Sequence, residues 1–345
     1  MLLERKENIL RIIVGEYIMM ASPVGSEAIA KKYGLGVSPA TIRSEMARLE
    51  EEGYITRRHT SGGSVPSDKG YRYYVESLVE EEEIPQGEQR MICHLFHQVE
   101  SELEEWTRLA AVLLARLVQN IAIITAPKAI ESRFKHLELV ALQEFLALLI
   151  LLIQEARLKQ QLLAFDEAIS QEELNFISHK LNAAFKGLTK YQILAQGLEL
   201  SPVEEHVRKA LVQIMEGEDQ QRFEEPNIEG IRHMLMQPEF ASSQKMLGLI
   251  EVLEDRTLMR SILPETPAEG GIQVIIGAEN KDDALKGCSV VITRYGVPGE
   301  ATGALGVVGP TRMRYGKAIS AVRYMGSLMS ELVGELHSGE LPRRN

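Results

Sequence analysis

Apolar residues recur at intervals of three and four through the first 53 residues of the chain, which predicts three short amphipathic helices. Gly25 and Ser26 mark the start of the second helix, and residues 34–37, Gly-Leu-Gly-Val, form the turn before the third. The apolar positions that define the first two helices are Ile9, Ile12, Ile13, Tyr17 and Met20, then Ile29 and Tyr33.

The third helix has both of its ends marked in the sequence. Ser38 is a suitable N-cap, and Pro39 suits the first helical position because its missing N–H would have no partner there. Gly53 is a suitable residue for a left-handed stop. The apolar positions form one narrow stripe, so we expect the opposite face to be exposed. This stripe consists of Ile42, Met46 and Leu49.

A two-stranded ribbon is predicted directly after the third helix. Residues 54–58 form the first strand and residues 59–63 form a glycine-containing tip. Ser64 and Val65 then begin a return strand that Pro66 ends. Three helices followed by such a ribbon are the arrangement of a winged helix-turn-helix, which places one helix in the major groove of DNA.

The face of the third helix opposite the apolar stripe combines small side chains with arginines. Small side chains allow a close approach, and arginine reaches phosphates or guanine edges. The ribbon and a helix predicted for residues 68–79 add basic residues. The simpler alternative is a charged surface helix in a small helical domain. The candidate DNA-binding residues are Ser38, Ala40, Thr41, Arg43, Ser44, Arg48, Arg57, Arg58, His59, Lys69 and Arg72.

The charge of the chain is unevenly distributed. The 345 residues have a net charge of −11, yet residues 1–75 contain 11 Lys+Arg and 9 Asp+Glu, a net charge of +2. The remaining residues therefore have a net charge of −13. This distribution favours DNA binding at one end of the chain only.

Beyond an acidic linker at residues 80–87, the chain alternates between helical and strand-like patterns. Strands on both sides of a helical, loop-rich stretch predict an α+β domain that is interrupted by another domain. The predicted strands are residues 121–125, 134–142, 145–153, 271–277, 289–295 and 304–308, and the predicted helices are 88–119, 170–185, 240–263 and 311–336. The predicted domains are residues 1–83 for DNA binding, 88–186 and 239–345 for the interrupted domain, and 187–238 for the insertion.

The helix at residues 88–119 has apolar spacings of three and four over a length that suggests a dimer-forming or domain-spanning element. The helix after Ser170 has Glu173 in the position that completes a capping box. Ser201 and Glu204 repeat this pattern inside the insertion.

Neither a metal centre nor a catalytic set is indicated by the sequence. Cys93 and Cys288 are too few for a disulfide framework or a four-thiolate site, and Cys93 with His97 is a pair without a third ligand nearby. Arg312 and Arg314 at a helix start could hold an anion, although such arginines are more often surface residues. We therefore expect no enzyme activity, no cofactor and no bound metal.

We expect a cytoplasmic protein. The first residues, Met-Leu-Leu-Glu-Arg-Lys, lack the apolar stretch of a signal peptide. The longest apolar run, residues 145–153, is shorter than the roughly 20 residues that a membrane-spanning helix needs.

Several short motifs resemble the HrcA family, the bacterial heat-inducible transcription repressors. The resemblance implies a winged helix, a GAF-like domain and an inserted dimerisation domain. It also implies a homodimer that represses chaperone operons at the CIRCE inverted repeat and depends on the chaperonin to stay active. The motifs are SPATIR at residues 38–43, HTSGGSVPSDKGYRYYV at 59–75, QPEF at 237–240, GIQV at 271–274 and GVVGPTRM at 306–313.

The sequence departs from this family in one position and leaves two other functions open. Ser64 stands where the family commonly has Arg or a similar residue, so we expect the wing to contact phosphates rather than enter the minor groove. A ligand-sensing winged-helix regulator is one alternative, and it would require a polar, convergent pocket in the body. An enzyme with an appended DNA-binding domain is the other, and no catalytic motif supports it.

Overall fold

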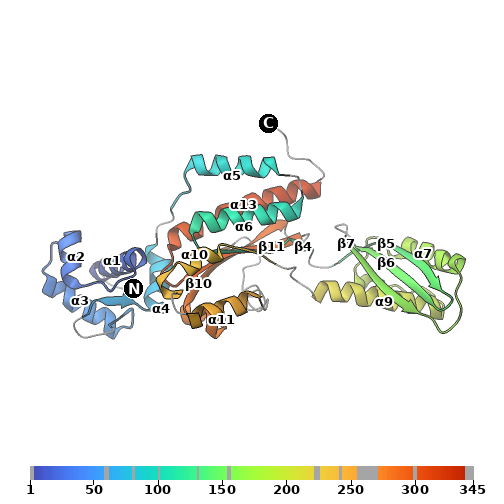
Figure 1. Cartoon of the computed structure of the whole chain (residues 1–345), viewed down its shortest axis with the longest axis horizontal. Helices are drawn as coiled ribbons and strands as arrows, with labels where there is room; N and C mark the ends of the chain where they lie inside the picture. The colour runs from blue at the N-terminus through green and yellow to red at the C-terminus, as the bar shows by residue number, and fades with distance from the viewer. Residues whose placement is uncertain are drawn as a thin grey trace. The chain divides into compact units, whose positions relative to one another are not determined.

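A computed structural model of the chain divides into two compact units (Figure 1). The first unit comprises Met1–Pro127, Glu225–Pro298 and Thr302–Asn345, and the second comprises Lys128–Glu224 and Gly299–Ala301. The structure describes residues 4–57, 62–79, 82–99, 102–129, 132–153, 157–220, 226–240, 243–254, 271–297 and 301–338.

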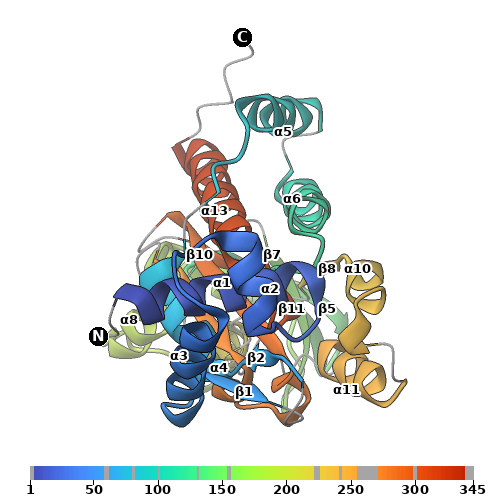
Figure 2. The ribbon, with the colours of Figure 1, turned by 90° about the vertical axis from the view of Figure 1, so that its left-hand side faces the viewer.

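The first unit begins with three helices and a two-stranded antiparallel ribbon, which lie together in Figure 2. These elements are α1 (Glu4–Met20), α2 (Ser26–Tyr33), α3 (Pro39–Glu51), β1 (Ile55–Arg57) and β2 (Ser64–Pro66). The stripe of Ile42, Met46 and Leu49 on α3 is buried, as predicted. Met20 is the last residue of α1, as the predicted helix requires, but its side chain is 60% exposed, and the buried positions of the helix end at Ile18.

The next helix starts at the predicted place and connects the ribbon to the rest of the unit. It comprises α4 (Asp68–Tyr73) and one π-helical turn, η1 (Tyr74–Leu78), and the Ser67 hydroxyl caps it by accepting from the Gly70 N–H. Tyr71 on this helix is buried and packs against the ring of Tyr315, 6.0 Å away between centroids. Helix α4 therefore packs through Tyr71 against the rest of the first unit.

The predicted long helix at residues 88–119 is two helices, α5 (Gln86–Gln98) and α6 (Leu103–Val118). Val99 is extended, with φ −87° and ψ 155°, so the helix ends there. The sequence has neither Gly nor Pro at the break, which is why the pattern did not reveal it. Trp106 and Leu113 of α6 are buried inside the first unit, so this apolar face is used within the chain.

The sheet of the first unit has the strand order β8-β3-β11-β10-β9. Helices α6 and α13 pack against each other, α6 also against β3 and α13 against β10 (Figure 1). The strand predictions at 121–125, 271–277, 289–295 and 304–308 are confirmed. The strands are β8 (Asn227–Glu229), β3 (Ile121–Ile124), β11 (Ala301–Pro310), β10 (Cys288–Val297) and β9 (Gln273–Ile276).

The remaining helical elements of the first unit lie between β8 and α13. Of the helix predicted for residues 240–263, the described part is residues 243–254, and residues 255–270 lie outside the described structure. The elements are α10 (Ile231–Leu235), η2 (Pro238–Phe240), α11 (Ser243–Glu254), η4 (Gly277–Glu279), η5 (Asp283–Leu285) and α13 (Tyr315–Ser338).

The second unit is a three-stranded antiparallel sheet, in the order β5-β6-β7, packed against helices. Helix α7 packs on β5 and α9 packs on β7. The capping boxes predicted at Ser170 and Ser201 are both formed. The elements are β4 (Lys128–Ala129), β5 (Phe134–Gln143), β6 (Leu146–Ile153), β7 (Arg157–Ala164), α7 (Gln171–Phe185), α8 (Lys190–Ala195) and α9 (Pro202–Gln220).

The boundaries of the interrupting unit differ from the prediction. The strands predicted at 134–142 and 145–153 pair with each other and with β7, and their buried residues share one core with α7 and α9. Of the insertion predicted at 187–238, residues 187–224 belong to a unit that already begins at Lys128, and residues 225–238 belong to the first unit. Strand patterns do not say which sheet a strand joins, and the sequence offered no other signal.

The fold is thus mixed, with α-helices and antiparallel sheets in both units, which agrees with the predicted α+β class. Within the described residues, no helix is long and apolar enough to cross a membrane. The same residues contain no group of three or more His, Cys, Asp and Glu side chains that could hold a metal ion.

Two glycines in helices of the first unit should respond oppositely to replacement by alanine. A Cβ at Gly70 would overlap the carbonyl oxygen of Tyr54, so we expect Gly70→Ala to destabilise the unit by about 1–3 kcal/mol. Gly15 in α1 has no atom near its Cβ position, so Gly15→Ala should stabilise by up to about 1 kcal/mol. Urea unfolding followed by the fluorescence of Trp106, the single tryptophan, measures both. Equal effects would contradict the packing argument.

Candidate nucleic-acid interface

Helix α3 starts at a fully formed cap. The Ser38 hydroxyl accepts a hydrogen bond from the Thr41 N–H at 3.1 Å and lies 3.0 Å from the Thr41 hydroxyl. Both side chains are therefore engaged in holding the first turn. The cap leaves the positive end of the helix dipole exposed next to Ala40, where it can face an anionic ligand.

Two arginines lie on the exposed face of α3, and each makes only a long ion pair with a carboxylate. The Arg43 side chain is 64% exposed, and its nearest carboxylate is Glu27 at 3.9 Å. Arg48 is 56% exposed and lies 3.8 Å from Glu45. Exposed pairs at such distances contribute little, so both guanidinium groups can exchange these carboxylates for phosphates or base edges. Ser44 is exposed on the same helix.

The ribbon places Arg57 beside α3. The Arg57 Nε atom lies 3.2 Å from a carboxylate oxygen of Glu50 and donates to the Ser64 hydroxyl at 3.4 Å. Its side chain is 26% exposed, so it is less available than Arg43. The other two basic candidates of the ribbon, Arg58 and His59, lie outside the described residues.

Ser64 is not at the tip of the ribbon. It is fully buried in β2, and its backbone exchanges two hydrogen bonds of 2.9 Å with Val24. A side chain at this position faces the interior, so the absence of a charge there does not determine whether the ribbon enters a groove. This observation removes the basis of the expectation drawn from Ser64.

Lys69 is a residue of α4, and its side chain reaches the C-terminal end of α3. Its Nζ atom donates to the carbonyl oxygen of Glu52 at 2.8 Å and lies 4.5 Å from the ring centroid of Tyr54. The residue is exposed, which leaves part of the ammonium group free for a phosphate. It differs from Arg43 in that it also satisfies a carbonyl at the end of the helix.

Arg72 does not join the other candidate DNA-binding residues, because its side chain is bound to residues of β9 and η4. Its guanidinium donates to the Glu279 carboxylate, with an Nε–Oε1 distance of 2.8 Å, and to the carbonyl oxygen of Val274 at 2.7 Å. The hydrogen bond to Glu279 raises the pKa of the Arg72 guanidinium above its ordinary value. The structure thus uses Arg72 to attach α4 to β9 and η4, and we leave it out of the proposed interface.

A second arginine makes a similar attachment that the sequence did not reveal. The Arg312 guanidinium donates to the Ile18 carbonyl at 3.2 Å, to the Gln237 side chain at 2.6 Å and to the Glu239 carboxylate. Arg314 pairs with Glu82 at 3.0 Å. Both arginines therefore already pair with carboxylates of the protein, Arg312 with Glu239 and Arg314 with Glu82, and an external anion would have to displace these carboxylates. In the sequence both arginines stand at a predicted helix start, and Arg312 also lies in the motif at residues 306–313, but neither signal identifies a partner.

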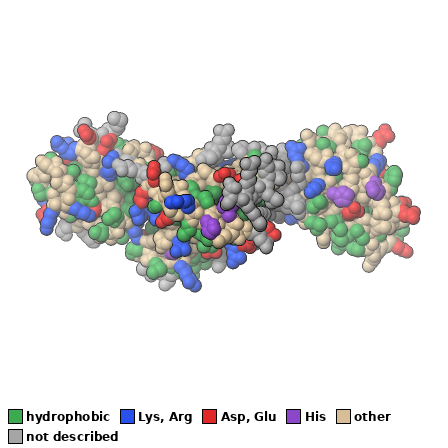
Figure 3. All heavy atoms as spheres, turned by 90° about the horizontal axis from the view of Figure 1, so that it is seen from above, with side chains coloured by type: hydrophobic (Ala, Val, Ile, Leu, Met, Phe, Trp, Pro, Cys, Tyr) green, Lys and Arg blue, Asp and Glu red, His purple; other side chains and the backbone are tan. Residues whose placement is uncertain are grey.

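On one face of the molecule, the basic side chains of the described residues are mixed with acidic ones. On the face drawn in Figure 3, Lys and Arg side chains are interspersed with Asp and Glu. This agrees with the small net charge of +2 over residues 1–75. On such a surface, DNA binding relies on contacts by individual basic side chains and less on nonspecific electrostatic attraction to the phosphates.

Comparison with known proteins gives the family. Residues 104–319 match the model of the HrcA protein C-terminal domain. The heat-inducible transcription repressor HrcA of Dehalococcoides mccartyi is 47% identical over 337 residues, which cover 98% of this chain and 97% of that protein. The protein of the same name from Herpetosiphon aurantiacus is 40% identical, with 97% and 96% covered.

The chain belongs to the HrcA family. This confirms the resemblance drawn from the short motifs. The family consists of transcription repressors and not of enzymes, which agrees with the missing catalytic motif. A crystal structure described as a hypothetical protein aligns with a TM-score of 0.59 and 24% identity, over 96% of this chain and 97% of that one. It shows a shared fold.

Arg72 and Glu279 should be energetically coupled. We expect Arg72→Gln and Glu279→Gln each to destabilise the first unit, and the double variant to differ from their sum by about 0.5–3 kcal/mol. Urea unfolding of the four proteins, followed by Trp106 fluorescence, measures this coupling. The matched cycle on Arg43 and Glu27, which are exposed and 3.9 Å apart, should give a coupling near zero. If the changes in the free energy of unfolding for Arg72→Gln and Glu279→Gln simply added in the double variant, the attachment of α4 through this pair would be contradicted.

Proposed function

We propose that the chain is a homodimeric repressor that binds the CIRCE inverted repeat of chaperone operons through a winged helix formed by residues 1–83. The exposed face of α3 carries this proposal. It presents Arg43, Ser44 and Arg48 on the side opposite a fully buried apolar stripe, so the helix is held by one face and free to read with the other.

The charges along α3 indicate which end of the helix would face DNA. Arg43 and Ser44 lie in its first half, whereas Glu50, Glu51 and Glu52 lie at its end. The first half would therefore meet the bases in the major groove, while the acidic end points away from the phosphates. Arg57, Arg58, His59 and Lys69 would contact the backbone on either side.

An inverted repeat needs two readers related by a two-fold axis. Because the apolar face of α6 that contains Trp106 and Leu113 is buried within the first unit, we place the dimer contact on the outward face of the sheet in the second unit. Burial alternates along β6, and every second residue, from Leu146 to Leu152, lies on this outward face.

The apolar side chains of this face form rows across the strands. Leu148 is paired with Val140 on one side and Leu162 on the other, and Leu152 is paired with Leu158. The outer members are exposed, at 39% for Val140, 58% for Leu162 and 54% for Leu158. Between these two rows, Ile150 is flanked by the polar residues Glu138 and Gln160. Exposed apolar side chains among polar ones are typical of an interaction surface, and a second copy of the same face would cover them.

The sheet of the second unit also suggests how heat acts. Strand β6 is apolar, uncharged and free of Gly and Pro, and both of its edges are paired in the folded protein. We infer that heating opens this sheet, exposes β6 and uncouples the dimer, which ends repression. A chaperonin would return the open chain to the binding form when it is free, and would not do so when other unfolded proteins occupy it.

Reading by α3 is tested with Arg43→Ala and Ser44→Glu. Loss of a bidentate base contact should weaken operator binding by about 1–3 kcal/mol, and a new carboxylate should repel the phosphates. Gel-shift titration on the operator measures this, and circular dichroism checks folding. Arg90→Ala, at an exposed arginine on α5, is the matched control and should leave the affinity unchanged. Unchanged affinity in both test variants would exclude α3 as the reading helix.

The dimer surface is tested with Leu158→Asp. A carboxylate buried between two copies would lack a partner, so we expect dissociation to monomers and weak operator binding. Sedimentation at several concentrations measures the assembly. Leu194→Asp is the control, because Leu194 is exposed to a similar extent, 52%, but lies on α8 outside the sheet. A dimer that survives the first change would place the interface elsewhere.

The thermal step is tested by heating the protein, cooling it and measuring operator binding with and without chaperonin and ATP. We expect heating to abolish binding and the chaperonin with ATP to restore it, because refolding of an exposed apolar strand competes with aggregation. Binding that survives heating unaided, or that the chaperonin does not restore, would contradict the mechanism.

A further inference from the structure

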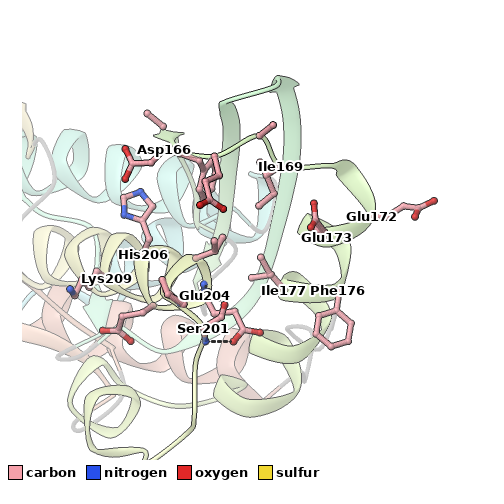
Figure 4. A pocket seen from close by; sticks show the side chains of 17 residues that line it. Asp166, Ile169, Glu172, Glu173, Phe176, Ile177, Ser201, Glu204, His206 and Lys209 are labelled. Atoms are coloured by element: carbon pink, nitrogen blue, oxygen red, sulfur yellow. Dashed lines mark hydrogen bonds between the residues drawn. The ribbon is translucent and has the colours of Figure 1, made fainter.

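The second unit has a groove on which none of the preceding functions depends. A cavity of about 1020 Å³ lies where the segment after β7 meets the first turns of α7 and α9 (Figure 4). Its lining includes four partly or fully buried apolar side chains, those of Phe165, Ile169, Ile177 and Val203. Ala164 of its lining is paired with Leu146, so the groove borders the outward face of the sheet, but none of Leu148, Leu152, Leu158 and Leu162 lines it.

The lining of the groove is strongly acidic. It contains six carboxylates and, as basic groups, only Lys209 and His206. The acidic residues are Asp166, Glu167, Glu172, Glu173, Glu204 and Glu205. A ligand that fits this charge is a cation.

Three of these carboxylates already have protein partners. Glu173 completes the capping box of α7, Glu204 lies 2.8 Å from Lys180, and Glu205 lies 2.8 Å from Arg208. The hydrogen bonds with Ser170 lower the pKa of Glu173, so it stays ionised. Their charges are therefore engaged in holding the helices.

The other three are exposed and make no hydrogen bond or ion pair with another described residue: Asp166, Glu167 and Glu172. Figure 4 shows Asp166 beside His206, whereas Glu172 extends outward from α7 at the opposite rim, so these carboxylates lie at two sides of the groove.

Aromatic side chains complete the groove. Phe176 on α7 is 68% exposed, an unusual state for a phenyl ring. Phe165 is packed edge-on against the His206 ring, with the centroids 5.6 Å apart, which fixes it in the floor. An exposed ring beside unpaired carboxylates can bind both the stem and the charged end of a Lys or Arg side chain.

We propose that this groove binds a basic, amphipathic peptide segment of a partner protein. Apolar side chains of the segment lie on Phe165, Ile169 and Ile177, and its Lys or Arg side chains face the unpaired carboxylates. The volume is that of a ligand site rather than of a packing defect. A neutral or acidic segment would leave the three carboxylates uncompensated, so the groove selects by charge as well as by apolar fit.

The test uses the full chain and a fluorescein-labelled 14-residue peptide of Lys and Leu in amphipathic helical order, followed by fluorescence anisotropy. We expect saturable binding that weakens as salt is raised. Phe176→Ser and Glu172→Lys should each weaken it about tenfold, as for central contacts of an interface. The same peptide with Glu in place of Lys should not bind.

Matched controls separate the groove from the general negative charge of the chain. Tyr191→Ser removes another exposed aromatic, 62% exposed on α8, and Glu216→Lys reverses another exposed acidic residue on α9. Neither residue lines the groove, so both variants should bind the peptide as the unchanged chain does. Equal losses in test and control variants, binding of the Glu peptide, or no binding of the Lys peptide would each overturn the proposal.

Discussion

The arrangement of the first unit depends on the charge-assisted hydrogen bonds of one guanidinium. Arg312, between β11 and α13, donates to the carbonyl of Ile18 at the end of α1 and to the side chains of Gln237 and Glu239. It therefore ties three segments that are distant in the sequence. Arginine suits this place because it has five donors in a rigid fork and remains charged at every physiological pH.

Arg72 adds a second tie, from α4 to Glu279 and to the backbone of β9. Charge-assisted pairs of this kind are stronger than neutral hydrogen bonds, and their loss would leave carboxylates without a partner. The helices that carry the candidate reading face are thus attached to the sheet at more than one point. Such attachment orders the reader before it meets DNA, which lowers the entropic cost of binding.

The surfaces of the two units differ in charge and polarity. The first contains α3 and all candidate DNA contacts, in a region whose first 75 residues have a net charge of +2. The second contains an apolar sheet face and an acidic groove, neither of which suits a polyanion. Their chemistry fits protein partners, a second copy for the sheet face and a basic segment for the groove.

The sequence by itself determined the local elements and the family. Ser38, Ser170 and Ser201 marked helix starts correctly, because a cap is a contact between residues three apart. Only the tertiary structure decided the break at Val99, the extent of the second unit and the role of Arg72. The role of Arg72 and the extent of the second unit depend on partners far away in the chain, Glu279 in the case of Arg72, and neither periodicity nor residue type specifies which distant carboxylate, strand or helix that partner is.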